Sequence, residues 1–351
     1  MLQSQNRRYL TSYEVISFDI EKNEVLGREE ENKNLFRLFK DLALLIYWFP
    51  LKACIRFIPL SGVYHLGRIG GYLLYLISKE KRQVLHNELK RIIPNENTKK
   101  ISQIIRKSFT NYCISELEVL LYPSIDSDYI RKNVSIIGRE YLDEALSNGT
   151  GVILLQAHFG AFQMVLPILG HCGYVINQIS ASASVWKSHA TTAIQKISLD
   201  KKAQYENLLP IKHFPIGEFL RPLFRALHRN EIVGVTTDGG AARKIVEVRF
   251  LGRKANFPRG AADLALKTGA VIIPVFIITE KNLYHRLVFH PPLIKKGDSD
   301  KYSSAASIMQ DFANILTDYI NQYPHHYGYM LCLRRMMASL DEYPFFLDYD
   351  Q

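Results

Sequence analysis

A histidine at the end of an apolar run is the residue of this sequence best suited to acid–base chemistry. Residues 154–164 read "LLQAHFGAFQM", so His158 closes the run and Gln163 follows five positions later. Five residues turn a continuous helix by about 140°, which separates two side chains, whereas a strand–turn–helix junction lets them meet. Imidazole exchanges protons readily near neutral pH. We interpret His158 as a candidate general base oriented by Gln163; the alternative is a structural histidine at a strand end.

The elements that would position His158 alternate between strands and helices. Apolar segments recur from residue 134 onward, and helical segments lie between several of them. They are "VSIIG", "GVILLQA", "GYVINQIS", "EIVGVTTD", "IVEVRFLG" and "AVIIPVFIIT". This pattern predicts an α/β fold with a mixed central sheet flanked by helices. Ligands of such sheets gather at the carboxyl ends of strands, where His158 would stand, and Gly160 would permit the tight turn after it.

The most apolar part of the chain lies near its N-terminus. Residues 1–33 are polar and predict a loosely ordered extension, whereas residues 34–78 predict a membrane-associated helical region. Residues 42–51 carry no charge, but a spanning helix needs about 20 apolar residues and two basic residues soon follow. Pro50 is expected to kink or end the helix. We favour a helix that lies in one leaflet; the alternatives are a core helix of a soluble domain and a short membrane span.

Composition narrows the classes of partner. The 351 residues are 47% hydrophobic, enough for one large domain or two ordinary ones with a substantial core. The net charge of +10 suggests an acidic partner: anionic lipid, a phosphorylated substrate or nucleic acid. No recognition motif supports nucleic acid, so none is expected as a partner. The four cysteines form no C-x-x-C pair, which argues against a zinc site and favours a reduced, cytosol-facing compartment.

The segment around His158 resembles a known catalytic motif. "HFGAFQ" is similar to the H-x-x-x-x-D/E motif of the lipid A biosynthesis acyltransferase family, the lauroyl and myristoyl transferases, with Gln163 in place of the acid. Residues 223–276 resemble that family's second block, in which a strand ending in Asp238 precedes "RFLGRKA", "FPRGAADLALKTGA" and "AVIIPVF". "DYINQYPHHYGYMLCLRR" resembles its closing Tyr-Pro and paired-Arg segment. The resemblance covers most of residues 35–335 and implies a glycerolipid acyltransferase-like fold.

The resemblance also implies a reaction. A fatty acyl chain would pass from an acyl thioester, carried by acyl carrier protein or coenzyme A, to a hydroxyl of a membrane glycolipid or phospholipid such as a lipid A precursor. His158 would deprotonate that hydroxyl, with no covalent acyl-enzyme, metal or bound cofactor. The protein would work at the cytoplasmic face of the inner membrane, peripherally or anchored by residues 35–60. Residues 79–338 would form the acyltransferase domain, and residues 339–351 a tail.

Several residues of the matched segments are expected to bind substrate. They are Phe159, Gly160, Asp238, Gly239, Arg259 and Gly260. Arg259 and Gly260, near the start of a helix, would suit a phosphate group. Basic residues nearby would add positive charge or form a solvated surface; they are Arg243, Lys244, Arg249 and Arg253. Because Gln163 carries no charge, the alternative function is a catalytically inactive acyltransferase-like protein that binds lipid or an acyl carrier.

One competing set of motifs belongs to another enzyme class. "SVWK", "YEN" and "KTG" occur in the order of a penicillin-binding serine enzyme. That class carries K-T-G on a strand, whereas "LALKTGA" predicts a helix end with Gly269 as its C-cap. We therefore set the serine-enzyme interpretation aside.

Overall fold

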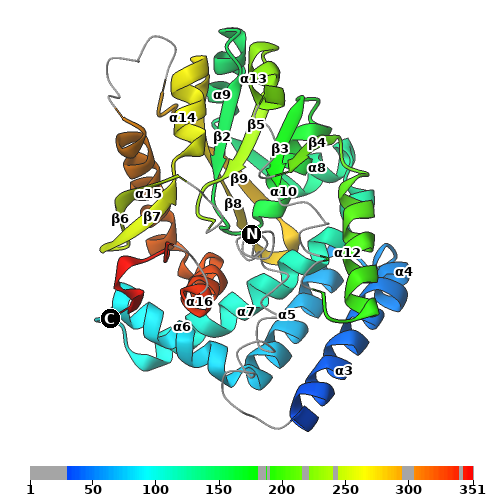
Figure 1. Ribbon diagram of the computed structural model, residues 1–351. Helices are drawn as coiled ribbons and strands as arrows, with labels where there is room; N and C mark the ends of the chain where they lie inside the picture. Colours follow the sequence, from blue (N-terminus) through cyan, green and yellow to red (C-terminus); the bar gives the residue numbers. More distant parts are fainter. Residues whose placement is uncertain are drawn as a thin grey trace.

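The computed structural model describes residues 30–180, 187, 190–215, 221–239, 244–294, 304–339 and 343–350. Within them, seven strands form a central sheet in the order β1-β9-β8-β2-β5-β3-β4, and β6 pairs with β7 separately (Figure 1). The strands are β1 (Val134–Ile137), β2 (Val152–Gln156), β3 (Ile176–Ser180), β4 (Ile211–Pro215), β5 (Ile232–Thr236), β6 (Ile245–Phe250), β7 (Arg253–Pro258), β8 (Val271–Thr279) and β9 (His285–Phe289). The sheet is parallel except between β8 and β9. The predicted α/β fold with a mixed central sheet is confirmed.

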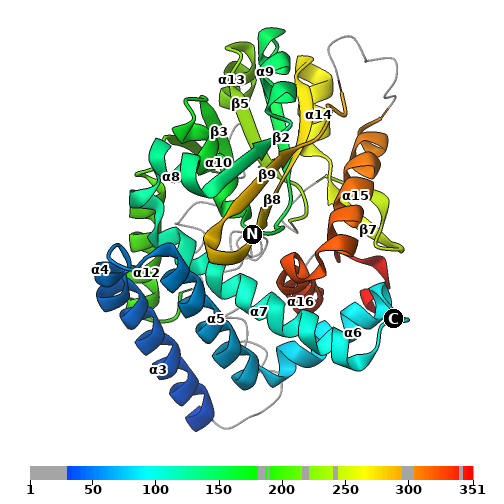
Figure 2. The same ribbon diagram turned by 180° about the vertical axis from the view of Figure 1, so that it is seen from behind.

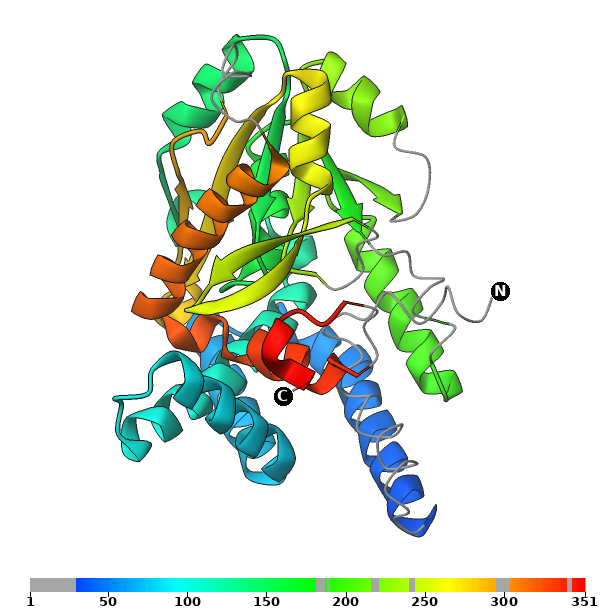
Figure 3. The same ribbon diagram turned by 60° about the vertical axis from the view of Figure 1, so that its left-hand side comes forward.

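Helices cover both faces of the sheet (Figures 2 and 3). The helical elements are α3 (Glu30–Ile46), η3 (Tyr47–Leu51), α4 (Lys52–Ile55), α5 (Leu60–Ile77), α6 (Lys79–Ile92), α7 (Thr98–Leu120), η4 (Tyr122–Ser124), α8 (Ser127–Asn133), α9 (Arg139–Ser147), α10 (Phe162–His171), α12 (Ala193–Glu206), α13 (Arg221–His228), α14 (Gly260–Thr268), η5 (Lys281–Leu283), α15 (Ala305–Gln322), η7 (Pro324–His326), α16 (Gly328–Met337) and η8 (Leu347–Asp350). Along β2, Ile153 and Leu155 join the core cluster of α13, α14 and α15, whereas Val152 and Leu154 join that of α9 and α10. A strand buried on both faces reads as an unbroken apolar run, which is why the sequence revealed β2.

The N-terminal helices are continuous through Pro50. α3 passes into the π-helical turn η3, which contains Pro50, and then into α4. A proline has no backbone N–H to donate, and a π turn accommodates that gap inside a helix, so Pro50 does not end the helix. None of the helices within the described residues is both long and apolar enough to cross a bilayer. α3 starts at Glu30, inside the segment expected to be an extension; residues 1–29 lie outside the described part.

Two helix ends agree with the sequence. α14 begins at Gly260 with Arg259 as its N-cap. It ends at Thr268, and Gly269 follows in the left-handed conformation with φ of 71°. "KTG" is therefore a helix end, as expected, and not the strand that the serine-enzyme interpretation requires.

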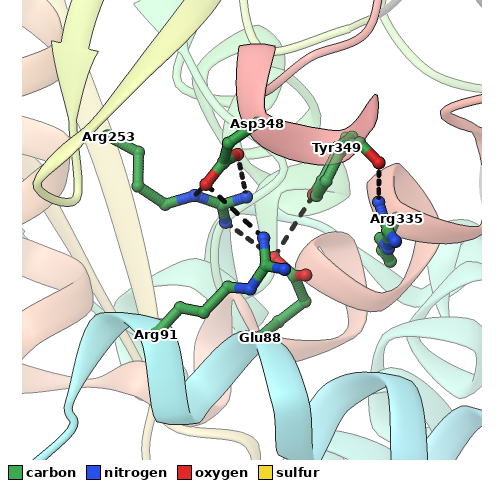
Figure 4. Close-up of polar contacts among 6 residues, drawn as sticks. All are labelled: Glu88, Arg91, Arg253, Arg335, Asp348 and Tyr349. Carbon is green, nitrogen blue, oxygen red and sulfur yellow. Dashed lines mark hydrogen bonds and ion pairs between the residues drawn. The ribbon is translucent and has the colours of Figure 1, made fainter. Parts of the chain in front are cut away.

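The C-terminal segment packs into the domain through a cluster around Arg253 (Figure 4). The Arg253 guanidinium bridges Asp348, which accepts from Nε at 2.8 Å, and Glu88 of α6, which accepts from Nη1 at 2.7 Å. The same guanidinium stacks on Phe346, 3.7 Å from the ring centroid. Arg335 of α16 donates to the backbone carbonyl of residue 349. The segment expected to be a tail is thus part of the core where it is described, and Arg253 is an internal ion-pair partner rather than a solvated charge.

Candidate active site

His158 and Asp238 meet because two neighbouring parallel strands end in register. β2 and β5 pair with Gln156 opposite Thr236, so the second residue past each strand lies at the same level. His158 Nδ1 is 2.7 Å from Asp238 Oδ1, and the His158 backbone N–H donates to Oδ2 at 2.9 Å. Because an ionised carboxylate only accepts hydrogen bonds, Nδ1 carries the proton and Nε2 is the basic nitrogen.

The surroundings of Asp238 keep its carboxyl group ionised. The Asp238 side chain is 0% exposed, whereas that of His158 is 17% exposed. Burial raises the pKa of Asp238, but the charge and hydrogen bonds of His158 and the charge of Arg334 outweigh it and hold that pKa below its usual range. Such a carboxylate stabilises the imidazolium that forms when histidine takes a proton. We expected Asp238 to bind substrate; enclosed behind His158, it contacts the histidine instead.

The turn after His158 is held from two sides. Gly160 has φ of 60°, and a β-carbon built there would lie 1.8 Å from the carbonyl oxygen of Ile277. Its backbone N–H donates to the His326 carbonyl oxygen at 3.1 Å. Phe159, which we expected to bind substrate, is 1% exposed and packs edge-on against Phe276. His158 is partly exposed, whereas the next residue, Phe159, points into the core. Phe159 therefore supports the core and not the substrate.

An open pocket lies beside His158. Its lining residues are Asn111, Tyr112, Ser115, Glu116, His158, Gly160, Phe162, Gln163, His326, Tyr329, Met330 and Leu333. α7 supplies one wall, the start of α10 another, and the segment from η7 into α16 a third. The pocket combines a histidine with amide, hydroxyl and carboxyl groups, and such convergent polar groups can orient a ligand.

Gln163 does not hold the His158 ring. Its side-chain Nε2 donates to Ser115 Oγ at 3.4 Å, and Tyr122 donates to its backbone carbonyl oxygen at 3.2 Å. The position on Nδ1 where we expected Gln163 is taken by Asp238. The sequence interpretation was wrong on this partner because α10 starts at Phe162 and directs Gln163 toward α7, away from the buried side of the ring.

The expected phosphate site is not beside this pocket. Arg259 donates to the carboxylate of Asp263, one turn further along α14, from Nε at 3.0 Å and from Nη2 at 2.7 Å. Neither Arg259 nor Gly260 lines the pocket. Gly239 stands next to Asp238, and a β-carbon built on it would lie 3.8 Å from Arg334 Nη2. Among the expected binding residues, the structure brings only Gly160 to the pocket beside His158.

Most of the residues that line the pocket were missed from the sequence, Glu116 and His326 among them. Glu116 is half-buried in the α7 wall; burial raises the pKa of its carboxyl group, Lys202 lowers it in part, and Glu206 raises it. His326 is 5% exposed, and burial together with His325 and His285 lowers its pKa well below the usual value. Asn111 and Ser115, four residues apart and so on one side of α7, were the available signal for this wall.

Comparison with known proteins identifies related sequences. A family model described as bacterial lipid A biosynthesis acyltransferase matches residues 34–335. A phosphatidylinositol mannoside acyltransferase of Mycolicibacterium smegmatis is 24% identical over 264 residues, covering 72% of this chain and 80% of the relative. A phosphatidylinositol mannoside acyltransferase of Mycobacterium tuberculosis is 26% identical over 171 residues, covering 45% of this chain and 48% of the relative.

Proposed function

Because the chain belongs to the bacterial lipid A biosynthesis acyltransferase family and is an enzyme that transfers acyl groups, we propose that it acylates a sugar hydroxyl of a membrane glycolipid. The observation that carries this proposal is the His158–Asp238 pair at the edge of an open pocket. The acyl donor is a thioester of acyl carrier protein or coenzyme A. No resident metal or cofactor takes part in this scheme.

The proposed reaction is a direct transfer. The acceptor hydroxyl gives its proton to His158 Nε2 as its oxygen attacks the thioester carbonyl carbon. Asp238 stabilises the resulting imidazolium from the other side of the ring. The tetrahedral intermediate then collapses, the carbon–sulfur bond breaks, and the imidazolium returns the proton to the leaving thiolate. The products are the acyl ester and the free thiol.

The pocket supports a polyhydroxyl acceptor. Asn111, Ser115, Glu116 and Gln163 offer both hydrogen-bond donors and acceptors within the same lining as His158. Neighbouring hydroxyls of a sugar are matched by such a mixed set, whereas the carboxylate of Glu116 disfavours a phosphate at that wall. The two mycobacterial relatives are named for a mannoside acceptor, which is consistent with a sugar in this pocket. A lipid A precursor has the same chemistry and is the alternative acceptor.

The test is acyl transfer by the purified protein, with acyl-coenzyme A and acyl-carrier-protein donors and with phosphatidylinositol mannoside and lipid A precursor acceptors. We expect an acylated product by mass spectrometry with at least one donor–acceptor pair. We also expect Gln163→Glu to change kcat by less than about fivefold, since Asp238 already holds the histidine. An inactive wild type that Gln163→Glu activates would instead support the lipid- or carrier-binding alternative.

The N-terminal helices carry an apolar surface that suits a membrane. The exposed large apolar side chains there are Leu38, Phe39, Leu42, Leu45, Ile46, Phe49, Phe57, Leu66, Ile69, Tyr72, Leu73, Leu76 and Ile77. α3 and α5, which bear most of them, lie together at the end of the molecule away from α9 and α13 (Figures 1 and 2). Concentrated exposed apolar area of this kind marks an interaction surface. We propose peripheral binding through this surface, with the helices lying in one leaflet.

The double variant Phe57→Glu with Leu73→Glu should bind vesicles of anionic and zwitterionic phospholipid at least about tenfold more weakly than wild type. Each substitution removes an apolar side chain that the lipid would bury and adds a negative charge that the anionic surface repels. These side chains are 76% and 55% exposed, so the fold tolerates the change. Vesicle flotation measures the loss. The matched control is Ile137→Glu with Val175→Glu, at 46% and 49% exposure, on sheet strand β1 and just before β3. Equal flotation of both double variants would contradict this membrane-binding surface.

A further inference from the structure

The walls of the pocket beside His158 differ in polarity. α7 contributes Asn111, Ser115 and Glu116 to the lining, whereas α16 contributes Met330 and Leu333. Residues 111 and 115 lie about one helical turn apart, roughly 6 Å along the axis of α7, and residue 116 follows directly. A sugar carries several hydroxyls and an acyl chain carries none, so the polar α7 wall is the one that suits the acceptor.

Glu116 is the one carboxylate among the described residues of this lining. The amides of Asn111 and Gln163 can either donate or accept a hydrogen bond, so they tolerate many substrate groups. An ionised carboxylate only accepts, and its hydrogen bonds are about twice as strong as neutral ones. Glu116 is therefore the group of this wall that most sharply distinguishes a donor, such as a hydroxyl, from an anion or an apolar group.

The Glu116 carboxylate lacks a partner of its own, although its backbone is held in place. The Tyr47 hydroxyl donates to the backbone carbonyl oxygen of Glu116 at 2.6 Å. Across the described part of the chain, the Glu116 side chain forms neither a hydrogen bond nor an ion pair. Its half-burial removes part of its water, and this burial is the main cause that raises the pKa of its carboxyl group. A ligand that displaces the remaining water must supply a donor, or the carboxylate is left unsatisfied.

We propose that Glu116 is a specificity-determining residue: its carboxylate accepts a hydrogen bond from a second, unreacted hydroxyl of the acceptor, while His158 takes the proton of the hydroxyl that is acylated. The acceptor must then be a polyol, and Glu116 selects which of its hydroxyls reaches His158. An acceptor with a single alcohol hydroxyl, such as 1-acylglycerol 3-phosphate, leaves the carboxylate without a donor and brings a phosphate that it repels. The inference rests on the proposed function, of which it names the acceptor class.

The size of the expected selectivity follows from the burial of Glu116. Sites built to hydrogen-bond a hydroxyl reject the analogue that lacks it by about 10⁴- to 10⁵-fold when they are closed to water. Glu116 is half-buried, so water can replace part of the lost hydrogen bond. We therefore expect wild type to lose about 100-fold in kcat/KM when the second hydroxyl is removed from the acceptor.

The experiment measures kcat/KM of the full-length protein with deoxy analogues of phosphatidylinositol mannoside or the lipid A precursor, each lacking one hydroxyl, and with 1-acylglycerol 3-phosphate. With the parent acceptor, Glu116→Ala should be about 100-fold slower than wild type, and loss of the second hydroxyl should cost it less than about threefold more. Glu116→Gln keeps a neutral acceptor and should lie between wild type and Glu116→Ala. Alanine is the best helix former, so α7 should stay intact.

Glu144→Gln is the matched control. Glu144 is an exposed carboxylate of α9 and does not line the pocket, so this variant should keep the acceptor preferences of wild type. Wild type that acylates the parent and every deoxy analogue retaining the acylated hydroxyl at equal rates would overturn the proposal. Undiminished discrimination by Glu116→Ala would overturn it as well.

Calorimetric binding of the same acceptors, without a donor, separates this inference from the proposed function. Tighter binding of the parent acceptor than of one deoxy analogue, lost in Glu116→Ala, would support the hydroxyl subsite even in a protein that transfers no acyl group, and the proposed function alone would then fail. Acyl transfer with no such preference, in turnover or in binding, would reject the subsite and leave the proposed function standing.

Discussion

Replacing His158 with alanine is expected to lower kcat for acyl transfer on the order of 10⁴-fold, the upper range for loss of a general base. Nε2 is the nitrogen that can take the hydroxyl proton, because Asp238 engages Nδ1. The loss should appear in kcat at saturating donor and acceptor, measured by release of the free thiol. KM should change little, since the pocket walls formed by α7 and α10 stay in place.

His171→Ala is the control for this variant. His171 ends α10, the helix that begins beside His158, yet it does not line the pocket. Its removal should leave kcat within about twofold of wild type, since substitutions away from the site change little. Turnover by His158→Ala that equals the control would reject the proposed mechanism.

Asp238→Asn is expected to lower kcat on the order of 10³-fold. An amide can present N–H instead of a carbonyl oxygen to Nδ1, which allows the wrong tautomer, and it cannot stabilise the imidazolium by charge; the corresponding change in a serine protease triad costs about 10⁴. The measurement is the same thiol-release assay, together with the ring-nitrogen NMR signals of His158, which should report a mixture of tautomers.

The effects of His158→Ala and Asp238→Asn on kcat should not be additive. His158 and Asp238 act as one unit, so the double variant should be about as slow as His158→Ala alone. Asp263→Asn is the matched carboxylate control, because Asp263 pairs with Arg259 outside the pocket and its removal should leave kcat near wild type. A double variant slower than His158→Ala by the full effect of Asp238→Asn would show that the two residues act independently.

Strands that are buried on both faces could be identified from the sequence, whereas three other strands could not. β2, β5 and β8 are buried on both faces and read as apolar runs. β4, β7 and β9 each carry two adjacent charged or imidazole side chains and were not recognised. Their strand character comes from pairing with neighbours: β9 lies between β1 and β8, and β7 pairs with β6. Partner strands are set by tertiary contacts, which a local pattern does not contain.

The sequence by itself determined that His158 follows a buried strand, that Asp238 follows another, and that a glycine turn separates His158 from α10. It did not determine that the two residues form a pair. That was decided by the order of the sheet, because β2 and β5 are neighbours in register although 80 residues separate His158 from Asp238. The direction of α10 decided that Gln163 faces α7, where its side chain donates to Ser115. Residues distant in the chain become partners only when strands pair and helices pack, so the identity of the acid beside His158 is a property of the tertiary structure.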